Sequence, residues 1–473
     1  MSDGLTISGG GSIRVSTEEM AENAAHLRRY AEAAGASCLR LGAVERAISE
    51  HTLVTFDAPL SAARADATID DCVTTLTHTR LQAQALVAML DIAATSYGLA
   101  ERANEIVARH IAATLAYALG RVYPLILTWL TPHLLGAAGA WFLTPEERQR
   151  RVIDWLGAHS GMLSDPRVVE LLRLSVSSVD EFGAGALRVP PELLGLLGDE
   201  ALGVLGFGAS ASVLLGTVRS LGLARETEVS VARTNLNVHR AAPGGFEDLA
   251  KNIPAHSEQI RVDRVPSDAG PDRFIVYIGG TREGSLSSGT EPFDGTSNLG
   301  GMAQGAPLSI GDTGSMQAVR LAMEQAGVTA ETPVYFVGYS QGAITGVSLA
   351  ESGDYTVEGI FTVGGPTGEL DVPDGAPYLA LEHEEDIITS LGGLHRDNDT
   401  VVVRRAVFEG EEPPKDSLLP AHSLARYRES SALLDAAHEP RIAEAGAHLR
   451  EFVGGASKVE SSTYLARREG QSQ

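Results

Sequence analysis

Residues 334–342 read V-Y-F-V-G-Y-S-Q-G and are the most informative stretch of the C-terminal half of the chain. A short apolar, β-branched run stops at Gly338, and Ser340 stands between that glycine and Gly342. A serine on a strained strand-to-helix turn leaves no room for a Cβ two residues to either side. The pattern therefore predicts a buried strand, a sharp turn that exposes Ser340, and a helix that begins directly after it.

The residues after the turn support this interpretation. Residues 343–350 read A-I-T-G-V-S-L-A, and the small residues Ala343 and Gly346 allow a helix to pack closely on a sheet. A bare G-x-S-x-G is weak evidence, since the chain contains 51 glycines. The apolar run before Ser340 and the small residues after it favour a nucleophile over a chance match.

From residue 228 the chain alternates strand-like runs with amphipathic helical windows. The strand candidates are V-S-V-A, Q-I-R-V-D-R-V, F-I-V-Y-I, V-Y-F-V, G-I-F-T-V, Y-L-A-L and V-V-V-R-R-A-V. This alternation predicts an α/β domain over residues 228–455, with a mostly parallel sheet covered by helices. Residues 456–473 are expected to form a polar, disordered tail.

An acidic cluster follows one of the strand candidates. After Y-L-A-L comes E-H-E-E-D-I-I, where Asp386 at the start of a loop is the preferred acid of a Ser-acid-His triad. Its rivals, which as a charge cluster are most simply a solvated edge, are Glu382, Glu384 and Glu385. His383 lies among them, but the cluster lacks a recognised ligand spacing, so no metal is predicted.

A histidine later in the chain completes the triad order. His422 in L-P-A-H-S-L-A-R-Y follows the last strand candidate and precedes a final helix, which makes it the preferred general base. Two alternatives remain. His395 lies close to Asp386 and before the last strand candidate, and His438 lies within helical sequence.

Residues 274–278 form an apolar run that ends in Gly279-Gly280-Thr281, where a loop beside the turn at Ser340 is needed. Backbone N–H groups of Gly280 or Thr281 are candidates for one oxyanion donor, and the N–H of Gln341 is the second. The glycine- and serine-rich residues 282–313 that follow suggest a lid or substrate rim, with a mobile surface loop as the alternative.

The N-terminal residues 1–113 predict an antiparallel helical hairpin or bundle. A capping box, S-T-E-E at residues 16–19, starts a long helix, and two apolar seams recur at helical spacing on either side of a tip near Thr55. Pairing the two seams about that tip sets Cys38 opposite Cys72, the only cysteines in the chain. They are candidates for a disulfide, and two reduced, buried thiols are the alternative.

Residues 114–227 read as a helical linker or platform with Leu-Gly-rich connections. Residues 122–143 contain no formally charged group and are long enough to span a bilayer. Pro124 and Pro132 interrupt this segment and favour a buried helix pair, although contact with a membrane stays open.

The overall charge limits the choice of partners. The chain carries 61 acidic and 37 basic residues and a formal charge of -24, which repels nucleic acid and anionic membrane surfaces. The N-terminal sequence lacks the basic and apolar regions of an ordinary signal peptide, so export needs a different route.

Ser340, Asp386 and His422, in G-Y-S-Q-G followed later by H-S-L-x-x-Y, resemble the α/β-hydrolase serine esterases and lipases, in particular their cutinase-like and lipase-like branches. The resemblance covers residues 228–455. It implies acyl-enzyme chemistry on a small-molecule or lipid ester, without a cofactor. One departure is I-G-G-T where many lipases carry Pro-Gly or His-Gly. An acyltransferase with the same triad, or a catalytically silent interaction protein, is the alternative.

The helical hairpin resembles the substrates of type VII (ESX) secretion, with Tyr97 and Glu101 in Y-G-L-A-E as the Tyr-x-x-x-Asp/Glu export signature. No Trp-x-Gly stands at the tip, where the sequence is V-T-F. The resemblance implies secretion, or placement in the cell envelope, by a non-Sec route that involves the type VII machinery or a helical partner. A helical pair that only packs or dimerises, in a cytoplasmic protein, is the alternative.

Overall fold

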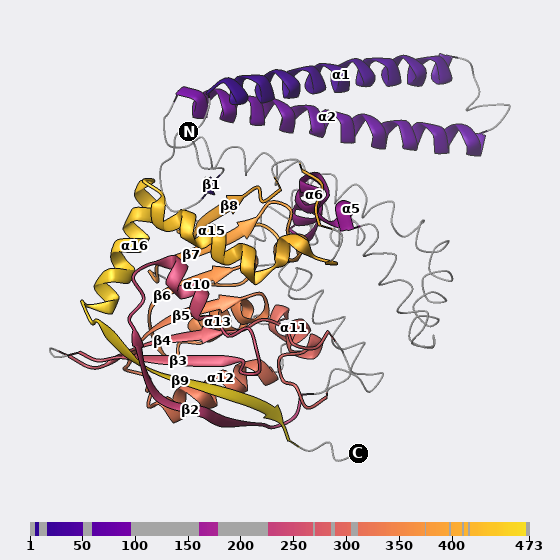
Figure 1. Ribbon diagram of the computed structural model, residues 1–473. Helices are drawn as coiled ribbons and strands as arrows, with labels where there is room; N and C mark the ends of the chain where they lie inside the picture. Colours follow the sequence, from indigo (N-terminus) through magenta and orange to yellow (C-terminus); the bar gives the residue numbers. More distant parts are fainter. Residues whose placement is uncertain are drawn as a thin grey trace. The chain divides into compact units, whose positions relative to one another are not determined.

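Figure 1 traces the chain in the computed structural model, which describes residues 5–8, 17–50, 59–95, 160–177, 226–267, 270–284, 289–303, 311–373, 375–396, 399–408, 411–414 and 417–469. The chain divides into two units. Residues 11–110 form the two-helix unit, and residues 1–10 and 111–473 form the α/β unit.

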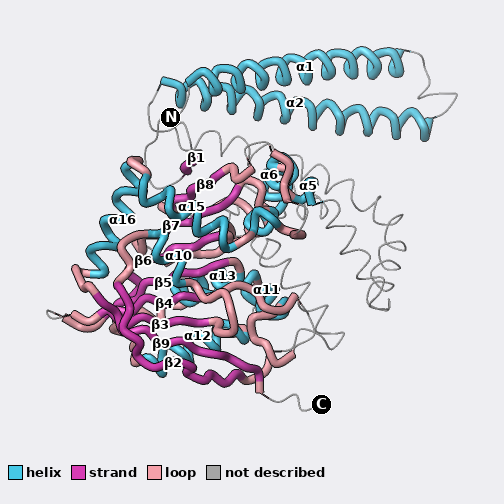
Figure 2. The backbone as a smooth tube through the Cα atoms, viewed as in Figure 1, coloured by secondary structure: helices cyan, strands magenta, loops and turns pink. Residues whose placement is uncertain are grey.

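Nine strands of the described residues form one mixed sheet in the α/β unit, in the order β1-β8-β7-β6-β5-β4-β3-β9-β2 (Figure 2). Strands β4 to β8 are parallel, whereas β1 at one edge and β3, β9 and β2 at the other pair antiparallel. The bounds are β1 Leu5–Ser8, β2 Val229–Ala241, β3 Ile260–Val265, β4 Arg273–Ile278, β5 Pro333–Tyr339, β6 Thr356–Val363, β7 Tyr378–His383, β8 Val401–Arg405 and β9 Lys458–Arg468.

Helices cover both faces of this sheet, and each face has its own apolar core. One face packs against α11 (Gly295–Met302), α12 (Gly314–Ala326) and α13 (Gln341–Glu351), and the other against α10 (Phe246–Asn252), α15 (Leu424–Ala436) and α16 (Pro440–Val453). Alternate residues of a strand enter opposite cores, as Phe274 and Ile275 do. Burial on both faces explains why the central strands read as continuous apolar runs.

Short helices complete the described part of the α/β unit. They are α5 (Ser160–Leu163), α6 (Pro166–Val176), α14 (Ile387–Ser390) and the 3-10 helix η1 (Pro420–His422). Helix α6 contacts α14 through Arg173, whose guanidinium donates to the Thr389 hydroxyl at 3.2 Å. Most of the expected platform over residues 114–227 lies outside the described residues, and so do residues 122–143. Among the helices that are described, none combines the length and the apolar composition that crossing a membrane requires.

The end of the chain corrects one expectation. The expected polar tail over residues 456–473 contains β9, which lies between β2 and β3 in the sheet. Along β9 the side chains of Val459, Tyr464 and Ala466 are buried. The polar residues between Val459 and Tyr464 hide the alternation locally. Both partner strands are also distant in sequence, since β3 pairs Ile260 with Tyr464 and β2 pairs Val229 with Arg468. β1 likewise joins the sheet, beside β8, although residues 1–113 were assigned to a helical hairpin.

The two-helix unit consists of α1 (Thr17–Glu50) and α2 (Pro59–Thr95), which pack along one another (Figure 1). The buried side chains of this unit are all apolar, and they are Ala31, Ala34, Ile69, Ala83 and Leu86. The Cys38 thiol lies 3.9 Å from the Val73 carbonyl oxygen and 3.8 Å from the Thr77 hydroxyl. Cys72 is exposed and both thiols are free, so the candidate disulfide is not formed. Cys38 thus lies beside Val73 and Thr77, whereas a simple pairing about the tip sets it opposite Cys72.

Candidate active site

The turn at Ser340 has the strained geometry that the sequence motif predicts. β5 ends at Tyr339 and α13 begins at Gln341, so Ser340 is the single residue between strand and helix. Its backbone angles are φ 53° and ψ -119°, and among the described residues it is the one non-glycine residue with positive φ. Such a conformation costs on the order of 1 to 3 kcal/mol and persists only where the surrounding structure enforces it.

The two glycines of the motif are required by shape, which confirms the prediction made for them. A Cβ on Gly338 would lie 2.4 Å from the carbonyl oxygen of Gly342. A Cβ on Gly342 would lie 2.2 Å from the carbonyl oxygen of Ile278. Both clashes are with backbone atoms, which cannot rotate away as a side chain can. The turn therefore brings β4, β5 and α13 together at separations that only glycine permits.

The structure brings Ser340, His422 and Asp386 into one hydrogen-bonded line. His422 Nε2 lies 2.9 Å from Ser340 Oγ, and His422 Nδ1 lies 2.7 Å from Asp386 Oδ2. Ser340 follows β5, Asp386 follows β7, and His422 lies in η1 after β8. These strands are parallel, so their carboxyl ends meet at one edge of the sheet. Because a carboxylate only accepts, Nδ1 carries the proton that points to Asp386, and Nε2 of the neutral ring accepts from Ser340.

The Asp386 carboxylate is buried and held on both oxygens. Asp386 is 1% exposed and is the N-cap of α14, where its Oδ1 accepts the backbone N–H of Ile388 at 3.0 Å. Its Oδ2 accepts from His422 and also from the Tyr427 hydroxyl at 2.6 Å. Three donors therefore fix the orientation of this side chain.

The rival acid Glu382 forms a different cluster. Its Oε1 lies 3.0 Å from His395 Nε2, and its Oε2 lies 3.0 Å from Arg404 Nε and 3.4 Å from an Arg173 guanidinium nitrogen. Burial acts to raise the pKa of Glu382, but the cationic partners outweigh it and hold that pKa well below its usual range. The alternative base His395 thus pairs with the alternative acid Glu382, away from Ser340.

The remaining alternatives are also engaged or placed elsewhere. The Glu385 carboxylate accepts the backbone N–H groups of Val407 and Phe408. Glu384 Oε1 lies 3.4 Å from the Thr6 hydroxyl of β1. His438 is exposed and lies between α15 and α16, outside the helical sequence to which it was assigned.

Two backbone segments lie beside Ser340 and carry the candidate oxyanion donors. A Cβ on Gly280 would be 3.2 Å from Ser340 Cβ, so the Gly280 backbone runs beside the serine. Gln341 is the first residue of α13, and an N–H in the first turn of a helix has no acceptor within that helix. Thr281 is exposed, and its hydroxyl accepts from the Asn298 side chain at 2.9 Å. Gly280 and Gln341 are therefore the candidate donors that lie beside Ser340, and the backbone N–H of Thr281 remains the alternative to that of Gly280.

Three aromatic side chains around the site were given no role by the sequence. The Tyr339 ring stacks on His422 with centroids 5.2 Å apart, and its hydroxyl donates to the His422 backbone carbonyl. Tyr427 donates to Asp386, and His383 stacks on Tyr427 with centroids 3.7 Å apart. Tyr427 is the tyrosine of H-S-L-x-x-Y, so the motif contained a signal for its position.

Other predicted features are described only in part. The glycine-rich segment over residues 282–313 contains α11, whereas residues 285–288 and 304–310 lie outside the described residues. Asp294 caps α11 and its backbone carbonyl accepts from the Gln341 side chain at 3.0 Å, which ties this segment to the start of α13. Tyr97 and Glu101, the candidate export motif, lie outside the described residues.

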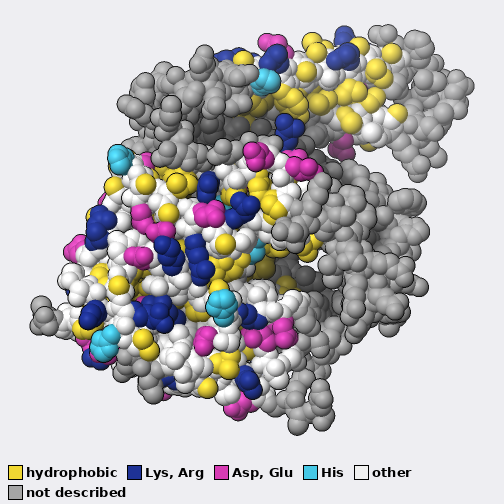
Figure 3. All heavy atoms as spheres, viewed as in Figure 1, with side chains coloured by type: hydrophobic (Ala, Val, Ile, Leu, Met, Phe, Trp, Pro, Cys, Tyr) yellow, Lys and Arg dark blue, Asp and Glu magenta, His cyan; other side chains and the backbone are white. Residues whose placement is uncertain are grey.

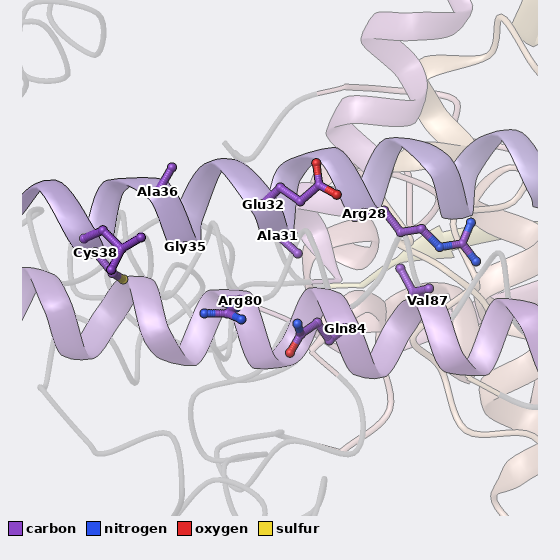
Figure 4. A pocket seen from close by; sticks show the side chains of 10 residues that line it. Arg28, Ala31, Glu32, Gly35, Ala36, Cys38, Arg80, Gln84 and Val87 are labelled. Atoms are coloured by element: carbon purple, nitrogen blue, oxygen red, sulfur yellow. The ribbon is translucent and has the colours of Figure 1, made fainter.

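A groove of about 640 Å³ lies between α1 and α2, lined by side chains from both helices (Figure 4). Its polar lining consists of Arg28, Glu32, Cys38, Arg80 and Gln84, with neither a histidine nor a serine. It therefore lacks a nucleophile paired with a base. The described residues also include no group of three or more histidine, cysteine, aspartate and glutamate residues placed to hold a metal ion.

Charges on the described surface are mixed. On the face of the α/β unit that Figure 3 shows, basic and acidic side chains alternate without a continuous basic patch.

No protein-family model, curated protein or solved structure matches the chain. The geometry and chemistry of the site are therefore the basis for assigning a function.

Proposed function

We propose that the α/β unit is a serine ester hydrolase that acts through an acyl-enzyme on a small-molecule or lipid ester. The observation that carries this proposal is the line from Ser340 through His422 to Asp386, at 2.9 and 2.7 Å, on a turn that holds Ser340 at positive φ. A strained, hydrogen-bonded serine beside a histidine oriented by a buried acid is the arrangement that activates a hydroxyl.

In the first half of the reaction His422 Nε2 takes the proton from Ser340 as Oγ attacks the ester carbonyl carbon. The tetrahedral intermediate collapses when the same proton passes to the leaving alkoxide, which departs as an alcohol and leaves an ester on Ser340. Asp386 keeps the imidazole in the tautomer with the proton on Nδ1 and stabilises the imidazolium that forms.

In the second half a water molecule replaces the alcohol. His422 removes its proton, the hydroxide attacks the acyl carbon, and Ser340 leaves with that proton as the carboxylic acid is released. The backbone N–H groups of Gly280 and Gln341 donate to the oxyanion in both halves. One such donor is worth about 10²- to 10³-fold in rate.

The architecture is consistent with the α/β-hydrolase fold, which we propose for this unit. The elbow lies between a central parallel strand and a helix, and the serine, acid and histidine follow in that chain order after β5, β7 and β8. The same arrangement serves acyl transfer to an alcohol other than water, which differs only in the acceptor.

Hydrolysis of p-nitrophenyl esters of increasing acyl length tests the function. We expect steady turnover by the wild-type chain, its loss in Ser340→Ala and His422→Ala, and a fall of about 10⁴-fold in Asp386→Asn, which misorients the histidine. Glu382→Gln is the matched acid control and keeps turnover if it folds. A single stoichiometric release of p-nitrophenol that becomes continuous only when an alcohol acceptor is added identifies an acyltransferase. No release from folded protein favours a catalytically silent interaction protein.

For the two-helix unit we propose a role in export by a type VII-like route, which places the protein outside the cytoplasm or in the cell envelope. This proposal is supported by two packed helices and by the Tyr97 and Glu101 signature in the sequence. Fractionation of the native host's culture tests it. We expect Tyr97→Ala to remain in the cells and Tyr30→Ala, an exposed tyrosine of α1, to be exported. Equal export of both variants removes Tyr97 from the proposal.

A further inference from the structure

Tyr427 and His383 form a buried aromatic pair directly behind the candidate triad. Tyr427 on α15 is 0% exposed, and His383 at the end of β7 is also 0% exposed. Their rings stack at 3.7 Å between centroids with an interplanar angle of 6°. Neither side chain contacts the ester in the mechanism above, yet the pair is bonded to both Asp386 and the segment that carries His422.

The hydrogen bonds of Tyr427 have a single possible direction. Its hydroxyl oxygen accepts the backbone N–H of His383 at 3.1 Å, and the same hydroxyl lies 2.6 Å from Asp386 Oδ2. A backbone N–H can only donate and a carboxylate can only accept, so the phenolic proton points to Asp386. Burial, with the nearby Asp386 charge, raises the pKa of Tyr427 well above its usual range, and the phenol keeps this proton.

Asp386 Oδ2 is therefore shared by two donors, the imidazole Nδ1–H of His422 at 2.7 Å and the phenol at 2.6 Å. Sharing has two consequences. The carboxylate cannot rotate without losing both bonds, and part of its negative charge is taken up by the phenol. Less charge then faces the imidazolium that forms when His422 accepts the serine proton.

His383 fixes the position of the phenol and of the histidine segment together. Its Nδ1 lies 2.7 Å from the carbonyl oxygen of Ala421, the residue before His422, and its Nε2 lies 2.8 Å from the Ser430 hydroxyl. A carbonyl only accepts, so Nδ1 carries the proton. Burial lowers the pKa of His383 to about 4, which keeps the ring neutral near neutral pH. The Tyr427 ring also packs directly on Gly364, where an added Cβ would lie 2.6 Å from it.

We propose that Tyr427, held by His383, is a positioning residue of the candidate triad that shares Asp386 with His422 and so sets how strongly the acid supports the base. This inference rests on the proposed serine hydrolase function. Tyr427 acts through Asp386 and His422 and does not contact the substrate.

Tyr427→Phe removes the phenolic oxygen and keeps the ring. We expect kcat/KM for a short p-nitrophenyl ester to fall about 10- to 100-fold, because one charge-assisted hydrogen bond that orients the acid is lost. The full negative charge of Asp386 then faces His422, so the acidic limb of the kcat/KM profile moves to higher pH. The titratable groups around this cluster are Tyr339 of β5, Glu382 and His383 of β7, Arg405 of β8 and Tyr427 of α15.

Tyr335→Phe is the matched control, since Tyr335 is a buried tyrosine of β5 in the same core. We expect it to leave the rate and the pH profile unchanged. A Tyr427→Phe enzyme that folds and keeps the wild-type rate and profile overturns the proposal. So does a fall in rate without a shift of the acidic limb, because that result assigns Tyr427 a purely structural role.

A second variant covers the case in which Tyr427→Phe does not fold, and a second measurement does not depend on turnover. If Tyr427→Phe does not fold, site-specific 3-fluorotyrosine at position 427 keeps the shape and donates more strongly, so the acidic limb moves to lower pH; an unmoved limb overturns the proposal. The low-field proton resonance of the His422 to Asp386 bond can be measured without turnover, in Ser340→Ala. We expect it to move downfield when Tyr427→Phe is added. If Tyr427→Phe causes this shift while the wild-type chain has no esterase activity, the hydrolase function is refuted and the shared carboxylate stays in place.

Discussion

The sequence specifies the geometry of two regions in different ways. One region is the sheet edge that carries Ser340, and the other is the pair of helices α1 and α2. At the sheet edge a few positions have no alternative, because Gly338 and Gly342 face backbone atoms within 2.4 Å of an added Cβ. Between α1 and α2 the contact is a seam of small apolar residues, and Leu39 and Leu81 remain 76% and 58% exposed. Single residues therefore decide the geometry in the first region, whereas only an average pattern does so in the second.

The sharpest test of this contrast replaces one glycine in each region by alanine. In Gly342→Ala the new Cβ would lie 2.2 Å from the Ile278 carbonyl oxygen, and we expect a loss of about 4 kcal/mol or more, or no folded protein. In Gly42→Ala of α1 the Cβ meets nothing within 4 Å, and we expect a gain of about 0.5 to 1 kcal/mol. Thermal unfolding measures both. Equal tolerance of the two substitutions contradicts the contrast.

The next effect concerns the buried ion-pair cluster of Glu382 with Arg173 and Arg404. Arg173→Met removes a partner from Glu382 and the bond to Thr389, whose hydroxyl donates to the Asp386 carbonyl. Leaving a buried carboxylate short of a cation costs about 3 to 5 kcal/mol, and we expect denaturant unfolding of the α/β unit to show most of it. Arg167→Met, at an exposed position of the same helix, is the control and is expected to be neutral. An equal loss of unfolding free energy in the two variants would show that Arg173 stabilises the protein only as part of α6 and not through Glu382.

Acid sensitivity is the third expected difference. The folded pKa of His383 is about 4, below the ordinary value of 6.5, so the unfolded chain binds the extra proton first as the pH falls. The stabilisation is complete above pH 6.5 and is lost as the pH falls toward 4, by about 3 kcal/mol in all. Unfolding midpoints measured from pH 7 to pH 4.5 test this. His383→Gln should give a flatter curve over that window, and an equally steep curve assigns the loss to other groups.

The smallest effect is expected at the cysteines of the two-helix unit. Cys72 is exposed and Cys38 is half-buried, both as free thiols. Cys72→Ser should change stability by no more than about 0.5 kcal/mol, as is usual for surface substitutions. Alkylation of the native protein should modify Cys72 before Cys38. An intact mass two protons lower, with neither thiol reacting, would instead establish the disulfide.

Much of the site could be predicted from sequence because its requirements are local. Gly338, Ser340 and Gly342 stand within five residues, and their roles follow from backbone sterics at a single turn. Asp386 and His422 were identified from chain order and from their positions after strands, and the structure brings both to Ser340. The sequence already favours Asp386 over Glu382, but the role of Glu382 as the partner of Arg173 and Arg404 needed the structure, because such burial has no local signature.

The parts that sequence missed depend on contacts between distant residues. β9 reads as a polar tail because its pairing partners, β2 and β3, lie far back in the chain. The stack of His383 on Tyr427 joins residues of β7 and α15, and no spacing rule relates them. In the two-helix unit the Cys38 thiol lies beside Val73 and Thr77 and not beside Cys72, because side-chain packing between two long helices shifts the register in a way that no single residue specifies.

The most direct test of the central claim is covalent labelling of the folded, full-length protein with a fluorophosphonate probe, read by intact mass and peptide mapping. We predict one adduct, on Ser340, that is lost in Ser340→Ala and strongly slowed in His422→Ala, because the reaction needs the serine and its base. No adduct on the folded wild-type protein, or an adduct at another residue that persists in Ser340→Ala, would contradict the account.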